Sequence, residues 1–406
     1  MSASGSLRRN TIVDVVIIGG GVIGLSIARS LALRGVPDVI VIEKNDFGSE
    51  ASWAAGGILA PQIEADASNE FFRLACASRD MYRDFARDLR AESGIDVELD
   101  LTGTLCVGFT EAEENALRAR YHWQRSEGLD VELLNGEQAR TLEPCLSEQV
   151  RCALRFPNDL QVENRRLVQA LLVSNKKFGV QLIDHCAVQD VQVIAGRVRG
   201  VNTSHGSIGA SSVVIAAGAW SSLIDPAKAI QIEPVRGQML CFQAQPQIAR
   251  HVVYSSRGYL IPRRDGRLLA GSTTEEAGFD KSVTDEGMNA IKLMAIEIAP
   301  AVATLRRMDS WAGFRPRAAD DLPVLGMSVE IEGLVYATGH YRNGILLAPI
   351  TGELSAEMIV SRKTPAMVAA FSSERFQAPL TMRSVPGADR GPRAGSPRGV
   401  VDATGS

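Results

Sequence analysis

A glycine-rich segment near the start of the chain constrains the fold more than any other feature of the sequence. Residues 14–18 read DVVII, and this β-branched run predicts a parallel strand buried on both faces. From Val22 onward, apolar residues recur at intervals of four, which predicts a helix that ends near Gly35. Residues 39–42 predict a second buried strand. The chain therefore begins with a βαβ unit.

The turn between the first strand and the helix has the spacing Gly19-x-Gly21-x-x-Gly24. Gly19 allows a tight turn, Gly21 lets the backbone approach a pyrophosphate, and Gly24 lets the helix pack closely on the strand. Glu43 follows the second strand, where a carboxylate can accept hydrogen bonds from a ribose. A ligand-free turn is the weaker interpretation, because all of these features agree. The motif alone does not distinguish NAD from FAD.

Two later segments of small residues favour FAD. Residues 50–61 read EASWAAGGILAP, and residues 211–222 read SSVVIAAGAWSS. Glycines and alanines in these places let the backbone come close to a flat ligand. A nicotinamide-binding domain normally continues with a second βαβ half instead.

The rest of the chain predicts a mixture of helices and antiparallel strands. Residues 70–92 have an apolar helical face, and Thr110 with Glu113 forms a capping box that predicts the start of another helix. After residue 178, short β-like runs alternate with turns, and the Asp-Gly pair at 265–266 predicts a hairpin. We therefore expect an α/β fold in which a Rossmann-like nucleotide domain is interleaved with an antiparallel-sheet domain.

Composition argues against several other classes of protein. The net charge of −4 and the pI of about 5.9 give no electrostatic footprint for nucleic acid. The six cysteines form no C-x-x-C pair and the five histidines are scattered, so we expect no metal site, and we expect the reduced thiols of a cytoplasmic protein. Glycines and Arg29 interrupt the apolar residues 15–33, so we expect no membrane span there, and no targeting segment is visible.

Arg315 is an unusual residue within the segment WAGFRPRAADDLPVLG, residues 311–326. Its neighbours are small or apolar, and a guanidinium inside a protein needs an anion because it stays protonated. Two kinds of partner are open to it: an internal carboxylate, with Asp320 and Asp321 nearest in the sequence, or the carboxylate of a substrate.

Five segments, in the expected order, resemble the D-amino-acid oxidase family of flavin-dependent amine oxidases. They are the glycine-rich turn with Glu43, SWAAGGILAP, GYLIPRRDGRLLAGST, WAGFRPRAADDLPVLG and GHYRNGILLAP. The resemblance extends over residues 12–359, and within the family it is greatest to the glycine oxidases of bacterial thiamine biosynthesis. It implies a Rossmann-like FAD-binding domain of the D-amino-acid oxidase type and an antiparallel-sheet substrate domain.

The resemblance implies non-covalent FAD, because GHYRNGILLAP lacks the cysteine to which related sarcosine oxidases can attach flavin. The residues implied for the FAD site are Gly19, Gly21, Val22, Ile23, Gly24, Glu43, Lys44, Ala51, Ser52, Gly56, Gly57, Val188, Gly339, His340, Tyr341, Arg342, Asn343, Gly344, Ile345 and Leu346.

The resemblance also implies that Tyr259, Arg315 and Arg342 are catalytic and substrate-binding residues. A bidentate contact of Arg315 with the substrate carboxylate, assisted by the phenol of Tyr259, would hold the α-carbon for hydride transfer to flavin N5. Arg342 would either offset negative charge on the flavin or cap the pocket. Two departures from the family pattern, Arg257 and Ile58, are expected near the substrate and leave its identity open. A structural role is the alternative for Tyr259, Arg315 and Arg342.

The expected reaction is oxidative deamination of glycine or another small amine, such as sarcosine or a small D-amino acid. Molecular oxygen would accept the electrons and give hydrogen peroxide. The alternatives are an amine dehydrogenase with another acceptor, a flavoprotein without turnover and, weakest, a nicotinamide dehydrogenase. No residue has to act as a general base, so His340 is expected to be structural. The resemblance also implies a homo-oligomer, with a tetramer as one option.

We expect a discontinuous FAD-binding domain made of residues 12–85, 150–222 and 311–365. The expected substrate-binding domain comprises residues 86–149 and 223–310. Residues 378–406 are rich in Pro, Gly, Ser, Ala and Arg, which predicts a disordered tail without a core of its own.

Overall fold

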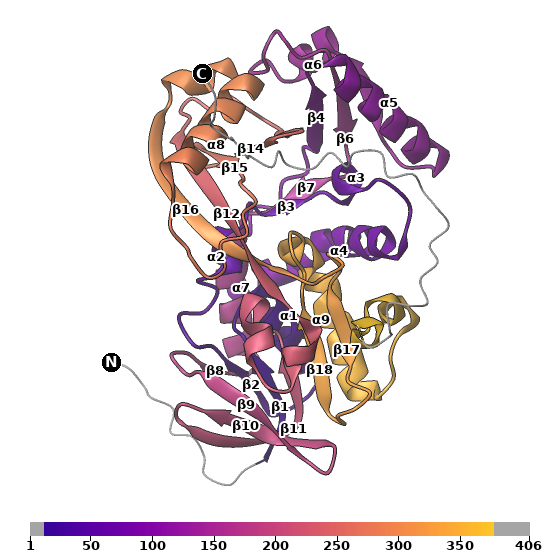
Figure 1. Cartoon of the computed structure of the whole chain (residues 1–406), viewed down its shortest axis with the longest axis vertical. Coiled ribbons are helices and arrows are strands. Elements are labelled where there is room, and N and C mark those ends of the chain that lie inside the picture. The colour runs from indigo at the N-terminus through magenta and orange to yellow at the C-terminus, as the bar shows by residue number, and fades with distance from the viewer. Residues whose placement is uncertain (1–11, 377–406) are drawn as a thin grey trace, which may run out of the picture.

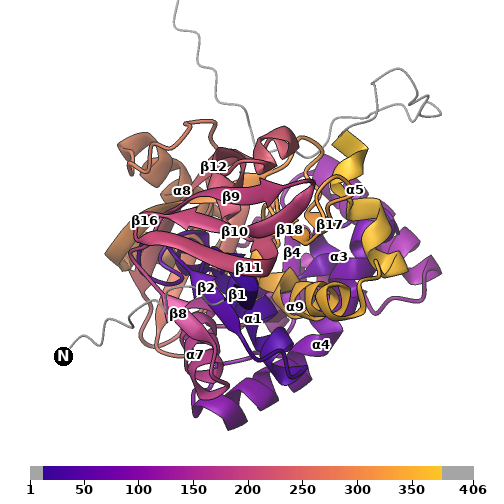
Figure 2. The same ribbon diagram turned by 90° about the horizontal axis from the view of Figure 1, so that it is seen from below.

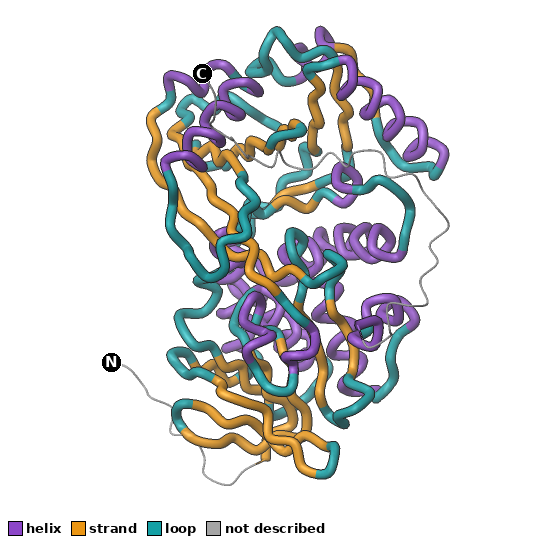
Figure 3. Tube along the Cα trace, viewed as in Figure 1, coloured by secondary structure: helices purple, strands orange, loops and turns teal. Residues whose placement is uncertain are grey.

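The architecture comes from a computed structural model that describes residues 12–376. The predicted tail at 378–406 lies outside the described residues. Figure 3 shows an elongated molecule with strands at its lower end, helices across its middle, and strands mixed with helices at its upper end. Each end is built on an eight-stranded sheet (Figure 1).

The first sheet has the strand order β17-β18-β11-β1-β2-β8, and β10 and β9 continue it from β11. The pairs from β18 to β8 are parallel, and the core of β1 is fully buried, which confirms the predicted strand. The bounds of its strands are β1 Ile12–Ile18, β2 Val39–Ile42, β8 Gln181–Ile183, β9 Val188–Ile194, β10 Arg197–Thr203, β11 Gly206–Ile215, β17 Val324–Met327 and β18 Leu334–Thr338.

Three helices cover one face of this parallel sheet, and the β9–β10 pair lies over the other face (Figure 2). The three helices are α1 Val22–Leu33, α7 Asn164–Lys177 and α9 Gly344–Ser361, and α4 Glu70–Ser93 packs behind them against α7 and α9. The predicted helix starts at Val22 and near residue 70 are confirmed. This layering leaves the carboxyl ends of β1, β2 and β11 open, which is where ligands bind in sheets of this kind.

Helix α9 is long and apolar enough to cross a membrane when judged by length and composition alone. However, 67% of its apolar window is buried within the molecule, where it packs against α1 and α4. Burial of most of the helix accounts for its apolar composition, so we interpret α9 as a core helix.

The second sheet has the order β16-β12-β15-β14-β13-β4-β6-β5 and is antiparallel except between β13 and β4. Its β14–β15 hairpin confirms the turn predicted from the Asp-Gly pair. Helix α8 packs on β12, β14 and β15, and α5 packs on β4 and β6. The bounds are β4 Thr104–Gly108, β5 Glu132–Asn135, β6 Cys152–Phe156, β12 Glu233–Gln243, β13 Val252–Ser255, β14 Gly258–Pro262, β15 Arg267–Gly271, β16 Arg306–Arg317, α5 Glu111–Ser126, α6 Gly136–Leu142 and α8 Asp285–Ile298.

Three of the expected domain boundaries need correction, and the division as a whole stays a prediction. Strands β6 and β16 both belong to the antiparallel sheet, although residues 150–222 and 311–365 were expected in the FAD-binding domain. The boundary at residue 311 is wrong because β16 is longer than expected. This strand pairs with β12 from Arg306 to Arg317 and so continues through position 311. The boundary at residue 85 falls inside the continuous helix α4.

Candidate active site

One long cavity is lined by residues from both sheets, from Val188 beside the parallel sheet to Tyr259 on the antiparallel one. It brings together most of the residues singled out in the sequence. These are Gly19, Gly21, Val22, Ile23, Glu43, Lys44, Ala51, Ser52, Gly56, Gly57, Ile58, Val188, Tyr259, Arg315, His340, Tyr341, Arg342, Asn343, Gly344 and Ile345.

Four of the predicted site residues do not line this cavity. Gly24 packs α1 onto β1, because a Cβ there would collide with the carbonyl oxygen of Gly19. Gly339 and Leu346 lie outside the lining as well. Arg257 forms an ion pair with Glu297 of α8, so the expectation that Arg257 lies near the substrate is not supported.

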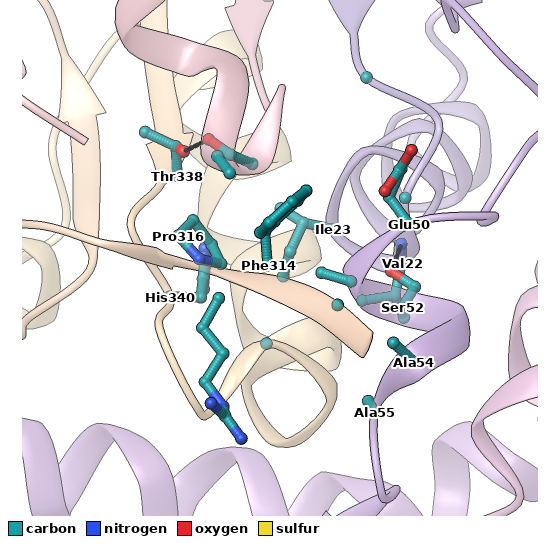
Figure 4. A pocket seen from close by; sticks show the side chains of 18 of the residues that line it. Val22, Ile23, Glu50, Ser52, Ala54, Ala55, Phe314, Pro316, Thr338 and His340 are labelled. Carbon is teal, nitrogen blue, oxygen red and sulfur yellow. Dashed lines mark hydrogen bonds between the residues drawn. The ribbon is translucent and has the colours of Figure 1, made fainter. Parts of the chain in front are cut away.

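The glycine-rich turn forms the floor of one end of the cavity. Gly19 has a φ of 110°, and a Cβ there would collide with Ala216 at the end of β11. The Ser52 hydroxyl accepts a hydrogen bond of 2.9 Å from the backbone N–H of Val22, which fixes α2 (Ala51–Ala54) against the start of α1. Figure 4 shows Val22 and Ser52 on one side of the pocket, across from Pro316 and His340.

Glu43 lies directly after the end of β2. Its carboxylate accepts hydrogen bonds from the backbone N–H groups of Gly20, at 2.8 Å, and Asn45, at 3.0 Å. These two contacts hold the side chain toward the glycine-rich turn, where it lines the cavity.

The Gly56-Gly57 segment is held by a residue that the sequence analysis missed. The buried guanidinium of Arg263 donates to the carbonyl oxygens of Gly56 and Val162, each at 2.8 Å. Gly57 has a φ of 68°, and a Cβ there would collide with the Val162 carbonyl oxygen. Arg263 therefore fixes the backbone of the cavity wall, an arrangement that a glycine pair makes possible.

Arg315 lies in a hydrogen-bond network with Tyr259. Its guanidinium donates to the Thr273 carbonyl oxygen at 3.0 Å and to the Ser272 hydroxyl, which also accepts from the Tyr259 hydroxyl at 3.1 Å. Gly237 on the neighbouring strand leaves room for this arrangement, because a Cβ at that position would collide with the Arg315 guanidinium. The predicted pairing of Arg315 with Tyr259 in one site is thus seen, with Ser272 as its link.

No carboxylate among residues 12–376 lies within ion-pair distance of Arg315. Asp320, one of the two internal candidates, instead accepts from Arg375 at 2.7 Å, and Asp321 does not contact Arg315 either. Burial lowers the pKa of Arg315, the neighbouring Tyr259 raises it, and the positive charge of Arg342 lowers it again. Burial and the charge of Arg342 both make an added anion favourable. The guanidinium therefore lines the cavity with its charge uncompensated.

Arg342 differs from Arg315 in having an acidic partner. Its guanidinium lies 3.6 Å from the carboxylate of Glu64, and this carboxylate is the main reason that the pKa of Arg342 is raised. Tyr254 and Tyr259 stand next to this pair, with their ring centroids 5.4 Å apart. All of these side chains line the same end of the cavity.

His340 is buried, and its Nε2 atom lies 3.1 Å from the Thr351 hydroxyl of α9. Burial lowers the pKa of His340 to about 3, so the ring is neutral at physiological pH. This geometry agrees with the hydrogen-bonding structural role expected for His340.

Sequence reasoning missed Glu64, Gly237, Tyr254, Arg263 and Ser272. Gly237 carried a usable signal, because a glycine inside a strand often marks the close approach of another group. The others carried none, because their roles depend on which distant segments meet them.

A family model described as FAD dependent oxidoreductase matches residues 14–358. The chain belongs to this family. FAD is therefore the cofactor of this oxidoreductase, and the extended cavity with its glycine-lined floor suits a dinucleotide. The match also confirms the fold class expected from the resemblance.

Individual relatives of this FAD-dependent oxidoreductase support the same assignment. It is 35% identical to a glycine oxidase of Pseudomonas aeruginosa over 86% of this chain and 95% of that protein. The crystal structure of glycine oxidase from Geobacillus kaustophilus is 34% identical, covers 90% of this chain and 99% of its own, and gives a TM-score of 0.86. A bifunctional protein ThiO/ThiG of Synechocystis is 36% identical over 89% of this chain, which spans about half of that relative's length.

Proposed function

We propose that this chain oxidises glycine or another small amine, such as sarcosine or a small D-amino acid. Similarity to glycine oxidases over most of both chains supports the substrate class. The single observation that carries the proposal is Arg315, a guanidinium with no acidic partner among the described residues, beside Tyr259 in the cavity of an FAD-dependent enzyme. The cavity offers this charge to an incoming anion.

We assign the FAD site to the residues at the glycine-lined end of the cavity. Backbone N–H groups at the start of α1 would hold the pyrophosphate, and Glu43 would accept from the ribose. Segments 51–57 and 340–345 would hold the flavin ring between them, since small residues line the first and the start of α9 the second. Non-covalent attachment stays a prediction, and Cys186 is the only cysteine in the described lining.

The chain's own residues would bind and orient the substrate. Arg315 fixes a carboxylate in place and in plane through two parallel N–H donors, which a lysine could not do. The Tyr259 hydroxyl would add a third contact by turning its single proton from Ser272 to the carboxylate, and the Ser272 hydroxyl would then donate to the phenol oxygen while it still accepts from Arg315. Bound FAD would accept the hydride that leaves the substrate α-carbon. His340 is neutral and occupied by Thr351, so we assign it no proton transfer.

The test replaces Arg315 with leucine and mixes the FAD-bound protein with glycine, sarcosine or D-alanine in the absence of oxygen. Loss of the visible flavin absorbance reports substrate oxidation. Arg315→Leu removes two hydrogen bonds to the charged carboxylate of the substrate. We therefore expect it to slow the bleaching by at least about 100-fold while FAD stays bound.

Arg317→Leu is the matched control, because Arg317 lies on the same strand but outside the cavity and pairs with Glu233 and Glu276 at 3.0 Å. It should bleach at the rate of the parent. Equal rates in the parent and Arg315→Leu would rule out the carboxylate contact. If none of the three amines bleaches the parent, the proposed substrate class is wrong.

We further propose that molecular oxygen accepts the electrons and that a cytoplasmic homo-oligomer is the working form. Peroxide release in the presence of glycine distinguishes an oxidase from a dehydrogenase that uses another acceptor. Sedimentation velocity tests the oligomer.

A further inference from the structure

The substrate end of the cavity contains two arginines but only one carboxylate beside them. Arg315 has no acidic partner among residues 12–376, whereas Arg342 lies 3.6 Å from Glu64. The remaining charged groups in the described lining, Glu43, Lys44 and Glu50, belong to segments at the glycine-rich end. The substrate end therefore presents one uncompensated positive charge rather than two.

Glu64 is held in this position from outside the cavity. It is the last residue of α3 (Pro61–Glu64), a single turn whose end is fixed by Arg120 of α5. The Arg120 guanidinium donates to the Ile63 carbonyl oxygen at 2.7 Å and to the Asp66 carboxylate at 2.9 Å. Arg120 thus holds the Ile63 backbone before Glu64 and the Asp66 side chain after it.

The start of the same turn is anchored by buried polar groups. The Gln62 side chain accepts from Arg79 at 2.9 Å and donates to Gln124 at 3.1 Å. The Gln62 carbonyl oxygen also accepts from the Gln124 side chain at 2.7 Å. These contacts fix the turn that carries Glu64, and the partly exposed Glu64 side chain extends from it to within 3.6 Å of Arg342.

We propose that Glu64 restricts the substrate to amines with a single carboxylate by neutralising Arg342. This inference rests on the proposed function, because it assumes that Arg315 binds the first carboxylate. A second carboxylate on the substrate would find Arg342 already paired and would meet the negative charge of Glu64. Specificity of this kind comes from repulsion of the wrong ligand as much as from attraction of the right one.

Two amines make a matched pair of probes for this inference. Sarcosine is glycine with a methyl group on its nitrogen, and iminodiacetate is glycine with a carboxymethyl group there. The pair therefore differs by one carboxylate at the same substrate atom. Selectivity is the ratio of kcat/KM for iminodiacetate to kcat/KM for sarcosine, each measured with the FAD-bound protein.

Glu64→Gln should raise this ratio by at least about tenfold, because it frees Arg342 for a charge-assisted hydrogen bond to the second carboxylate. Glu64→Asp keeps the charge and should stay near the ratio of the parent. Glu70→Gln is the matched control, since Glu70 is an exposed acid at the start of α4 that pairs with Arg73 outside the cavity. It should leave the ratio unchanged.

A gain of activity toward one substrate cannot come from a folding defect, which would lower both values together. An unchanged ratio in Glu64→Gln overturns the inference, and so does a rise of equal size in Glu70→Gln. If the parent oxidises neither sarcosine nor glycine, the proposed function itself has failed, which is a different result.

The parent protein gives a second measurement that needs no variant. Propionate and succinate are unreactive acids that differ by one carboxylate, and both can compete with glycine. We expect propionate to inhibit with an inhibition constant at least about tenfold lower than that of succinate. Equal inhibition by the two acids would overturn the inference even if Glu64→Gln did not fold.

Discussion

His340 lines the cavity, yet its chemistry is that of a buried core residue. Its ring nitrogen contacts Thr351 of α9, and burial holds its pKa at about 3. In the unfolded chain the same ring would titrate near pH 6.5. The unfolded state therefore binds one more proton than the folded state between these two values.

This difference predicts how the free energy of unfolding depends on pH. As the pH falls from 6.5 toward 3, His340 should cost about 1.4 kcal/mol of stability per pH unit. The measurement compares parent and His340→Gln by denaturant unfolding at several pH values. The comparison with the variant is needed because burial raises the pKa of Asp159 to about 7. Protonation of Asp159 therefore favours the folded state as the pH falls, which opposes the effect of His340. A parent-to-variant difference that does not change with pH would contradict the neutral, buried state of His340.

At the scale of elements, one connecting segment joins the two ends of the cavity. Residues 272–284 lead from β15 to α8 and include the Ser272 and Thr273 groups that hold Arg315. Further along, the Phe279 ring packs 5.3 Å from Trp220 and 5.6 Å from Phe314, and both of these partners line the cavity. The segment thus contacts the substrate end and the wall near the cofactor at once.

We therefore expect Phe279→Ala to weaken FAD binding by about 2- to 10-fold, the range that one or two aromatic contacts can supply. Lys281 would still hold the segment through its 2.7 Å ion pair with Glu50. The dissociation constant of FAD, measured by fluorescence titration of the apoprotein, is the test. Leu293→Ala removes an exposed apolar side chain of α8 and serves as the control. Equal affinities in both variants would show that the segment does not support the cofactor.

At the scale of the whole molecule, the sequence predicted what nearby residues determine. The opening βαβ unit and the β14–β15 hairpin depend on periodicity and turn residues within short stretches of chain, and both are seen. Strand β13 pairs in parallel with β4, nearly 150 residues earlier, and no local pattern indicates such a pairing. The boundary at β16 was mispredicted for the same reason, because the length of this strand depends on its pairing with β12, which is distant in the sequence.

The candidate site divides in the same way. Arg315, Tyr259 and the glycine-rich turn belong to recognisable segments, and the fold brings them into one cavity. Glu64 pairs with Arg342, and Ser272 accepts a hydrogen bond from Arg315. Both contacts join segments that are distant in the sequence, so they become visible only in the folded structure. The tertiary structure determines which group pairs with a buried charge. The sequence alone therefore could not tell whether Arg315 pairs with Asp320 or with a substrate. In the structure Asp320 pairs with Arg375 instead.

The most direct test of the central claim is a crystal structure of the FAD-bound protein with acetate, the carboxylate portion of glycine without its amine. We predict that both acetate oxygens lie within hydrogen-bond distance of the Arg315 guanidinium, with the Tyr259 hydroxyl beside them. Acetate on Arg342 instead, or Arg315 engaged by a carboxylate of the protein, would contradict it.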